Sequence, residues 1–230
     1  MSTCALVQAR LGSIRLPMKS LLCLRGLPLI DWVVRRTAKS ALLDRIVVAT
    51  PDTPLDETLA AHVRERLMPL DGRIAVFCGP EQDVLERFRA AGEAFGALRV
   101  VRVCADNPLI WGGEIDNLIR FFEATGCDYA YNHIPRNNRY PDGLGAEMLS
   151  FALLSELAAK ATEPKHREHC LSYLWDHAQD YDIRTFDPPD PLLRRPELKF
   201  DIDSPEEFRR LALMPLDIDM TPAELVRLYA

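Results

Sequence analysis

The sequence predicts an α/β fold whose sheet is largely parallel. Apolar segments of strand length recur through the first hundred residues, and a segment with helical periodicity lies between each one and the next. The helical segments are 12 to 14 residues long and the turns are short, which favours right-handed βαβ units. The predicted strands are residues 4–7, 44–50, 73–78 and 98–104, and the predicted helices are residues 29–40, 54–67 and 82–95.

The second half of the chain continues this pattern less regularly. A polar loop at residues 133–144 is rich in Pro, Asn and Arg, which is typical of functional or disordered segments. The last two helices are predicted to begin at capping boxes, where a hydroxyl residue, a proline and a third-position glutamate follow one another from Ser204 and from Thr221. We expect one domain over residues 1–230. The other predicted elements are helices at 113–125, 150–161 and 163–178 and strands at 127–132, 146–149, 183–186 and 198–202.

The composition favours a small anionic ligand over a nucleic acid or a membrane surface. The chain has 230 residues, a formal net charge of −6 and a pI near 5.4, which disfavours broad binding to polyanions. It contains no run of about 18 apolar residues and no basic region before an apolar amino-terminal stretch, so we expect a soluble, cytoplasmic protein. The six cysteines lack the paired spacings of zinc or redox sites, and we expect reduced core residues.

A group of cations directly follows the first predicted strand, in residues 8–19, which we call the basic loop. Anion sites recur at the carboxyl end of a first parallel strand in open α/β sheets. The basic loop matches neither the nucleoside-triphosphatase loop nor the dinucleotide-binding glycine motif, so it predicts a phosphate site of another kind. The alternative is an ordinary basic surface loop. Its candidate phosphate ligands are the cations Arg10, Arg15 and Lys19, the backbone at Gly12 and the hydroxyl of Ser13.

Two aspartates are predicted to reach the same edge of the sheet. Asp106 follows the strand at 98–104, and Asp203 ends the predicted strand at 198–202. Two carboxylates from distant parts of the chain suit Mg²⁺, which binds one or two carboxylates together with phosphate oxygens and water. Asp201 has the same strand parity as Asp203, and we favour Asp203 as the residue nearer the cleft. The alternative for either aspartate is a helix cap or a turn.

Several motifs follow one another in the order and spacing of a known family. They are residues 8–19, Val48-Ala49-Thr50, Asp83 to Phe88, Arg102 to Ile110, Glu168-His169 and Asp203 to Glu206. On these motifs the chain resembles the acylneuraminate and 3-deoxy-manno-octulosonate cytidylyltransferases, and most closely their spore-coat polysaccharide branch. The resemblance implies a nucleotide-diphospho-sugar transferase fold, a glycosyltransferase-A-like three-layer sandwich with a mostly parallel, mixed sheet. It also implies transfer of CMP from CTP to an acidic sugar, phosphate or phosphonate acceptor, with Mg²⁺ and release of pyrophosphate.

The resemblance implies a role for individual residues. Arg15 and Lys19 would stabilise the charge that develops when an acceptor oxygen attacks the α-phosphorus in line. Arg10, Gly12 and Ser13 would bind the nucleotide with Ala49, Thr50 and Asp83, and Asp106 and Asp203 would share the metal. The acceptor side would comprise Tyr140, Asp142, Glu147, Arg167, His169 and Tyr173, with His169 also a candidate base. Residues 1–110 would form the nucleotide-binding half, residues 111–230 would bind the acceptor and complete the metal site, and the protein would be a homodimer.

Two positions depart from the family pattern, and two other functions remain open. Met18 stands where the family usually has glycine, and Gly145 replaces an aspartate often found in the acceptor segment. The first alternative is a metal-dependent glycosyltransferase, because Asp201-Ile202-Asp203 also matches an Asp-x-Asp motif. The second is a non-catalytic nucleotide-binding homologue.

Overall fold

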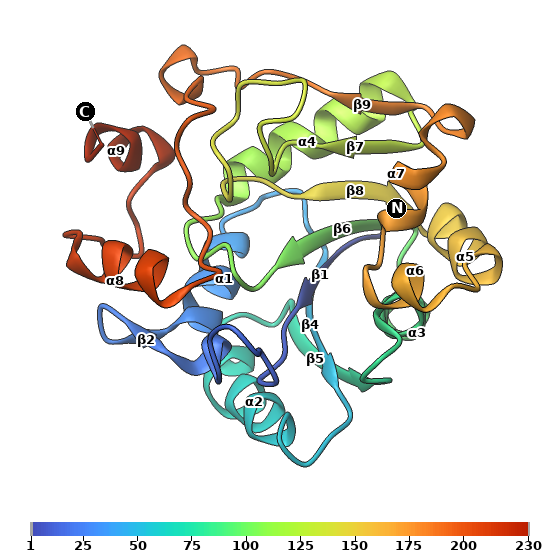
Figure 1. The fold of residues 1–230 in the computed structure, drawn as a ribbon, viewed down its shortest axis with the longest axis horizontal. Helices are drawn as coiled ribbons and strands as arrows, with labels where there is room; N and C mark the ends of the chain where they lie inside the picture. Colours follow the sequence, from blue (N-terminus) through green and yellow to red (C-terminus); the bar gives the residue numbers. More distant parts are fainter. Residues whose placement is uncertain (1, 230) are drawn as a thin grey trace.

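A computed structural model describes residues 2–229, and its centre is a seven-stranded mixed sheet (Figure 1). The strand order is β5-β4-β1-β6-β8-β7-β9. Most neighbours pair in parallel, whereas β8 is antiparallel to both β6 and β7, so the predicted α/β fold with a mostly parallel sheet is confirmed. The strands are β1 (Thr3–Gln8), β4 (Arg45–Pro51), β5 (Ile74–Gly79), β6 (Arg99–Cys104), β7 (Tyr129–Tyr131), β8 (Glu147–Ser150) and β9 (Ile183–Thr185).

Helices cover both faces of the sheet and make a three-layer sandwich. Alternate residues of β1 point to opposite faces, so that Ala5 and Val7 join one core cluster while Cys4 and Leu6 join the other. The first cluster includes residues of α1 (Leu29–Thr37), α2 (Glu57–His62) and α4 (Gly112–Thr125). The second includes residues of α3 (Val84–Ala94), α5 (Phe151–Lys160) and α7 (Ser172–Asp176), beside the short α6 (Pro164–Glu168).

The carboxyl-terminal segment forms a third core cluster against the hairpin β2 (Cys23–Leu24) and β3 (Leu27–Pro28). It contains α8 (Pro205–Leu213) and α9 (Pro222–Arg227), which lie on the same side of the molecule as this hairpin (Figure 1). Both helices begin at the predicted capping boxes, because Ser204 and Thr221 each exchange hydrogen bonds with the glutamate three residues on. This packing brings residues near 200 back to the sheet edge where β1 and β6 end.

Buried Arg36 of α1 fastens this carboxyl-terminal segment to the rest of the fold. Its guanidinium donates to the carbonyl oxygens of Leu109 and Ile110, and also to those of Ile218 and Met220. Burial lowers the pKa of Arg36 to about 10, with the charges of Asp219 and Asp217 opposing the shift.

Three sequence expectations are wrong in detail. Residues 163–178 do not form one helix, because the backbone leaves the helical region at His169 and turns both Cys170 and Leu171 into the core. Residues 198–202 do not form a ladder strand, because their hydrogen bonds go to two different segments, at Asp142 and at Asp106. The six cysteines are not all core residues, because Cys4, Cys127 and Cys170 are buried, Cys78 and Cys104 are half-buried, and Cys23 is exposed.

Two further details of the structure complete the fold. The helix predicted at 54–67 begins as α2 and continues as a π-helical turn, Val63–Leu67, and a 3-10 turn, Met68–Leu70. Other 3-10 turns are Lys19–Leu21, Ala178–Asp180 and Pro191–Leu193. Within residues 2–229, the helices are all too short or too polar to cross a lipid bilayer.

Candidate nucleotide and metal site

A cleft of about 460 Å³ opens at the sheet edge where β1 and β6 end. Three distant parts of the chain line it: the basic loop, the end of β6 with Asp106, and Asp203 just before α8. His169 lines it too, at the break between α6 and α7. The cations and carboxylates that the sequence predicted to share one edge therefore lie together.

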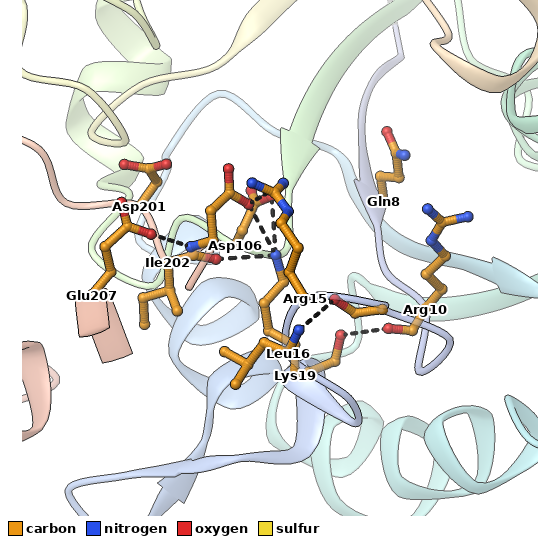
Figure 2. Close-up of polar contacts among 12 residues, drawn as sticks. Gln8, Arg10, Arg15, Leu16, Lys19, Asp106, Asp201, Ile202 and Glu207 are labelled. Atoms are coloured by element: carbon orange, nitrogen blue, oxygen red, sulfur yellow. Dashed lines mark hydrogen bonds and ion pairs between the residues drawn. The ribbon is translucent and has the colours of Figure 1, made fainter. Parts of the chain in front are cut away.

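Lys19 lies between the two predicted carboxylates, Asp106 and Asp203. Figure 2 shows the lysine beside Asp106 and Ile202. Its Nζ is 3.4 Å from Oδ2 of Asp106 and 3.5 Å from Oδ1 of Asp203, and it donates to the carbonyl oxygen of Ile202 at 3.0 Å. The more exposed Arg15 reaches the same Oδ1 of Asp203 at 3.1 Å. Only 14% of the Lys19 side chain is exposed. Two cations, Lys19 and Arg15, therefore pair with the carboxylates of Asp106 and Asp203 in this site.

Local hydrogen bonds shape the basic loop. The Ser13 hydroxyl accepts from the Leu16 amide at 3.4 Å, and the Ser20 hydroxyl donates to the carbonyl oxygen of Arg10 at 3.2 Å. The Leu11 amide donates to buried Asp56 at 2.7 Å, which ties the loop to the segment before α2. A Cβ added at Gly12 would meet nothing within 4 Å, so the backbone there faces open space.

Met18 has a left-handed backbone conformation, with φ 58° and ψ 21°. This region favours glycine, because a Cβ crowds the backbone there. The departure noted in the sequence thus falls at a position where glycine would be less strained. Met18 still closes the loop, since its amide donates to the carbonyl oxygen of Leu11 at 3.2 Å and the 3-10 turn that begins at Lys19 follows directly.

Arg102 and Gln8 also line the cleft, although the sequence argument gave them no role. Arg102 donates through Nε and NH2 to Oε1 of Gln8, at 3.2 and 3.0 Å, and pairs through NH1 with Glu147. The sequence does contain a signal for Arg102, because a charged residue within the apolar run Val100 to Val103 needs a buried partner or a ligand.

Glu147 lies behind Arg102 in a buried polar cluster. Its carboxylate also accepts from the Tyr129 hydroxyl at 2.8 Å and lies 3.0 Å from Nε2 of His133. Burial alone would raise the pKa of Glu147, but the charges of Arg102 and His133 and these hydrogen bonds bring that pKa well below its usual range. The protein itself therefore occupies both carboxylate oxygens of Glu147.

Asp203, rather than Asp201, faces Lys19. The amides of Asp203 and Ser204 both donate to Oε2 of Glu207, which fixes the backbone at the start of α8. Asp201 pairs instead with Lys199 at 3.3 Å, and Figure 2 shows it beside Glu207. Burial, together with the neighbouring Asp142 carboxylate, raises the pKa of Asp201 to about 6. The two aspartates of the Asp-x-Asp sequence do not converge on one point.

Several predicted ligands do not line the cleft. The side chains of Ala49 and Thr50 are fully buried in β4. Tyr140 is buried too, and its hydroxyl donates to Glu114 at 2.8 Å. Asp83 caps α3 and pairs with Arg167, and Tyr173 stacks on His177 with ring centroids 4.0 Å apart. Asp142 exchanges backbone hydrogen bonds with Leu198 and Phe200 and does not line the cleft either. Of the six predicted acceptor residues, only His169 lines the cleft.

Gly145 is required by the packing of the acceptor segment. A Cβ at this position would lie 2.2 Å from Oδ1 and 2.4 Å from the carbonyl oxygen of Asn132. Asn132 is buried and bonds both the Ala146 amide and the carbonyl oxygen of Glu114. The amide of Asn132 thus fills the space that the aspartate of the resembled family would need.

The donor set suits a divalent cation that arrives with phosphates. Within residues 2–229, His, Cys, Asp and Glu side chains form no group of three or more that could hold a metal ion. Asp106 and Asp203 already share one cation, the Lys19 ammonium, with the Ile202 carbonyl oxygen adjacent. Two carboxylates that need further oxygens from phosphate and water match the coordination that Mg²⁺ adopts in nucleotide sites.

A second, more open depression of about 800 Å³ lies between α2 and the start of α1. Its lining includes Asp31 and His62, which pair at 2.6 Å, and none of the predicted site residues. The smaller cleft is therefore the better candidate, because it gathers the cations and the carboxylates.

Comparisons with known proteins find relatives that match most of the chain. The sequence profile described as "Cytidylyltransferase" matches residues 4–209. The spore coat polysaccharide biosynthesis protein SpsF of Bacillus subtilis (strain 168) is 30% identical over 211 residues, which cover 90% of this chain and 83% of SpsF. The 3-deoxy-manno-octulosonate cytidylyltransferase of Geobacter sulfurreducens is 32% identical over 119 residues, 52% of this chain and 44% of that protein.

The fold also matches a solved structure over nearly its whole length. A cytidylyltransferase from Leptospira borgpetersenii serovar Hardjo-bovis (strain JB197) superposes with a TM-score of 0.86 at 22% sequence identity. The match covers 99% of this chain and 93% of the other.

Proposed function

The chain belongs to the cytidylyltransferase family of CTP-dependent nucleotidyltransferases, and we propose that it moves CMP from CTP to an acidic sugar or a related phosphate or phosphonate. The reaction forms a bond between an acceptor oxygen and the α-phosphorus of CTP and breaks the bond from that phosphorus to the bridging oxygen, releasing pyrophosphate. The acceptor class rests on the names of the relatives, one of which is a 3-deoxy-manno-octulosonate cytidylyltransferase.

One observation carries the proposal: Lys19 lies between Asp106 and Asp203 at the mouth of a cleft lined by Arg10 and Arg15. A triphosphate has several negative charges, and the cations of the basic loop can hold it while the two adjacent carboxylates hold the divalent cation that accompanies it. We assign Arg10, Ser13 and the backbone at Gly12 to the phosphates, because these groups line the cleft or face open space.

Catalysis in this proposal is positioning and charge stabilisation. Arg15 and Lys19 stabilise the charge that builds on the bridging and leaving oxygens, and no covalent nucleophile is required. A Mg²⁺ ion held by Asp106 and Asp203 supplies further neutralisation of the phosphate oxygens when bound. Residues 1–110 carry the nucleotide half, and residues 111–230 supply Asp203 and the acceptor side. We propose a homodimer as the working assembly, with light scattering as its test.

The test is pyrophosphate release from CTP and Mg²⁺ with 3-deoxy-manno-octulosonate and other acidic acceptors, together with mass spectrometry of the CMP conjugates. We expect Lys19→Ala and Arg15→Ala each to lower the rate by more than ~100-fold, because they remove charge that stabilises the transition state. Lys160→Ala is the matched control, since Lys160 pairs with Glu156 on the far helix α5. Equal, small effects for all three variants would contradict the assignment, and so would the absence of both CTP binding and pyrophosphate release.

A further inference from the structure

We infer that Lys19 competes with the divalent cation for the Asp106–Asp203 pair, so that this cation binds tightly only once a nucleotide has drawn Lys19 away. The inference rests on the proposed function for the identity of the nucleotide, but the competition itself follows from the contacts of Lys19 with the two carboxylates. In this inference Lys19 not only binds phosphate but also couples the binding of the nucleotide to the binding of the divalent cation.

The ammonium occupies the position that a shared metal ion would need. Nζ of Lys19 lies 3.4 Å from Asp106 Oδ2 and 3.5 Å from Asp203 Oδ1, so it is almost equidistant from the two carboxylates. A Mg²⁺ ion bound to the same two oxygens at about 2.0–2.1 Å, on the side that faces Lys19, would fall within contact distance of the ammonium. Two cations at such a separation repel strongly in a partly buried site, so they exclude one another.

Arg15 strengthens the competition on one side of the pair. It reaches Asp203 Oδ1, the same oxygen that faces Lys19, at 3.1 Å. Its side chain is 69% exposed, whereas that of Lys19 is 14% exposed, so solvent screens Arg15 far more. Lys19 is therefore the main competitor, and Arg15 contributes less.

A nucleotide offers Lys19 a second partner. The lysine is the last residue of the basic loop, and its long side chain can turn from the carboxylates toward phosphates held by Arg10 and Ser13. Each such movement uncovers the two carboxylates. Nucleotide and cation then help each other to bind, and by linkage each raises the affinity of the other by the same factor.

The test measures Mn²⁺ binding to the full chain by electron paramagnetic resonance, without any nucleotide. We expect Lys19→Met, which keeps most of the side-chain volume but removes the charge, to bind Mn²⁺ at least ~10-fold more tightly than the wild type, equivalent to about 1.4 kcal/mol. Arg15→Gln should give a smaller gain. Lys160→Met, which removes the lysine of the Glu156 pair on α5, should give none.

Two further measurements make the result decisive. Adding Asp106→Asn to Lys19→Met should abolish the increase in Mn²⁺ affinity. That result would assign the increase to the Asp106–Asp203 pair. The coupling can also be measured in the wild type, without any substitution. Saturating CTP should raise the Mn²⁺ affinity of the protein above its value without CTP, after the Mn²⁺ bound by CTP alone is subtracted. A Lys19→Met protein that is folded by circular dichroism and binds Mn²⁺ no more tightly than the wild type would overturn the inference.

Failure of the inference and failure of the proposed function give different results. A chain that neither binds CTP nor releases pyrophosphate, yet gains Mn²⁺ affinity on Lys19→Met, loses the proposed function and keeps the competition. A chain that catalyses the transfer but binds Mn²⁺ equally well with and without CTP keeps the function and loses the competition.

Discussion

Met18 shows how one residue can deviate from a family pattern and leave the fold intact. Its φ of 58° lies in a region where a side chain is strained, and its amide still closes the basic loop on Leu11. The strain lies beside Lys19, so it affects the position of the residue that contacts both carboxylates. The sequence identified the unusual residue, but only the backbone conformation explains why glycine is the common choice there.

Replacing Met18 by glycine should therefore stabilise the protein. We expect Met18→Gly to raise the free energy of unfolding by about 0.5 kcal/mol, because relief of about 1–2 kcal/mol of backbone strain exceeds the ~0.4–1 kcal/mol of entropy that glycine adds to the unfolded chain. In a chain of this size that gain raises Tm by about 1–2 °C, which differential scanning calorimetry resolves. Met18→Ala is the control, because alanine keeps a Cβ in the same conformation. An equal gain in the alanine variant would show that loss of the long side chain, and not the backbone, is responsible.

Residue types in the sequence predicted the basic loop and the two aspartates, and the structure brings Lys19, Asp106 and Asp203 together. They could be predicted because charged residues at strand ends emerge at a known edge of a parallel sheet. Burial could not be predicted in the same way. Tyr140 was predicted to bind the acceptor, yet its ring lies in the core. Burial depends on which distant segments cover a residue, and a local sequence pattern does not show this.

Among the elements, β8 joins the two halves of the sheet through a charged pair. It inserts antiparallel between β6 and β7, and its register places Glu147 opposite both Arg102 and Tyr131. The pair Arg102–Glu147 therefore lies inside the sheet, where a charge needs its partner. The strands around it were predictable from apolar runs. The break between α6 and α7 came instead from burial of Cys170 and Leu171, and the loss of a strand at 198–202 came from tertiary hydrogen bonds.

Glu147→Gln should destabilise the protein in a pH-dependent way. We expect a loss of about 3 kcal/mol at pH 7, because Arg102 keeps a buried charge without its counter-ion. The folded pKa of Glu147 lies below the unfolded value of about 4.3, so the carboxylate stabilises the fold above that pH and this contribution is lost as the pH falls. Urea unfolding at pH 7 and pH 3 should show the difference between wild type and variant shrinking at the lower pH.

The control for this prediction is Glu93→Gln. Glu93 pairs with Arg89 along α3 and is 66% exposed, so its loss should change stability by less than ~0.5 kcal/mol. A difference between Glu147→Gln and wild type that stays the same at both pH values would rule out the carboxylate charge as the cause.

The acceptor segment before β8 gives a second prediction about an element. Gly145→Ala should lower the free energy of unfolding by about 1–3 kcal/mol, because the new Cβ would overlap Asn132, whose amide is already hydrogen-bonded. Gly72→Ala is the matched control, since a Cβ there meets nothing within 4 Å. Chemical denaturation of both variants tests this. Equal stability of the two variants would mean that the segment can shift to make room.

At the scale of the whole molecule, the site depends on docking of the carboxyl-terminal segment. Phe200 and Ile202 are fully buried in the third core cluster, and they carry Asp203 to the sheet edge. The sequence predicted the capping boxes that begin α8 and α9, because those are local patterns. It could not predict that Arg36, on the first long helix, would hold this segment through the carbonyl oxygens of Ile218 and Met220 while it also binds those of Leu109 and Ile110.

Arg36→Met should therefore weaken the whole assembly. We expect a loss of about 3 kcal/mol or more, because buried carbonyl oxygens lose their donors, and hence a fall in Tm of at least ~6 °C. Arg35→Met is the control, since the neighbouring Arg35 is half-buried and a change within about 0.5 kcal/mol is typical of such positions. A fall in Tm of the same size in both variants would contradict the role given to Arg36.

The 184 positions that separate Lys19 from Asp203 have a consequence during protein synthesis. At about 5–20 residues per second, a ribosome needs roughly 10 to 40 seconds to proceed from the codon for the lysine to that for the aspartate. Throughout that interval the growing polypeptide has its basic loop but lacks one of the two carboxylates proposed to share the metal, so the proposed site cannot be complete before Asp203 has been synthesised.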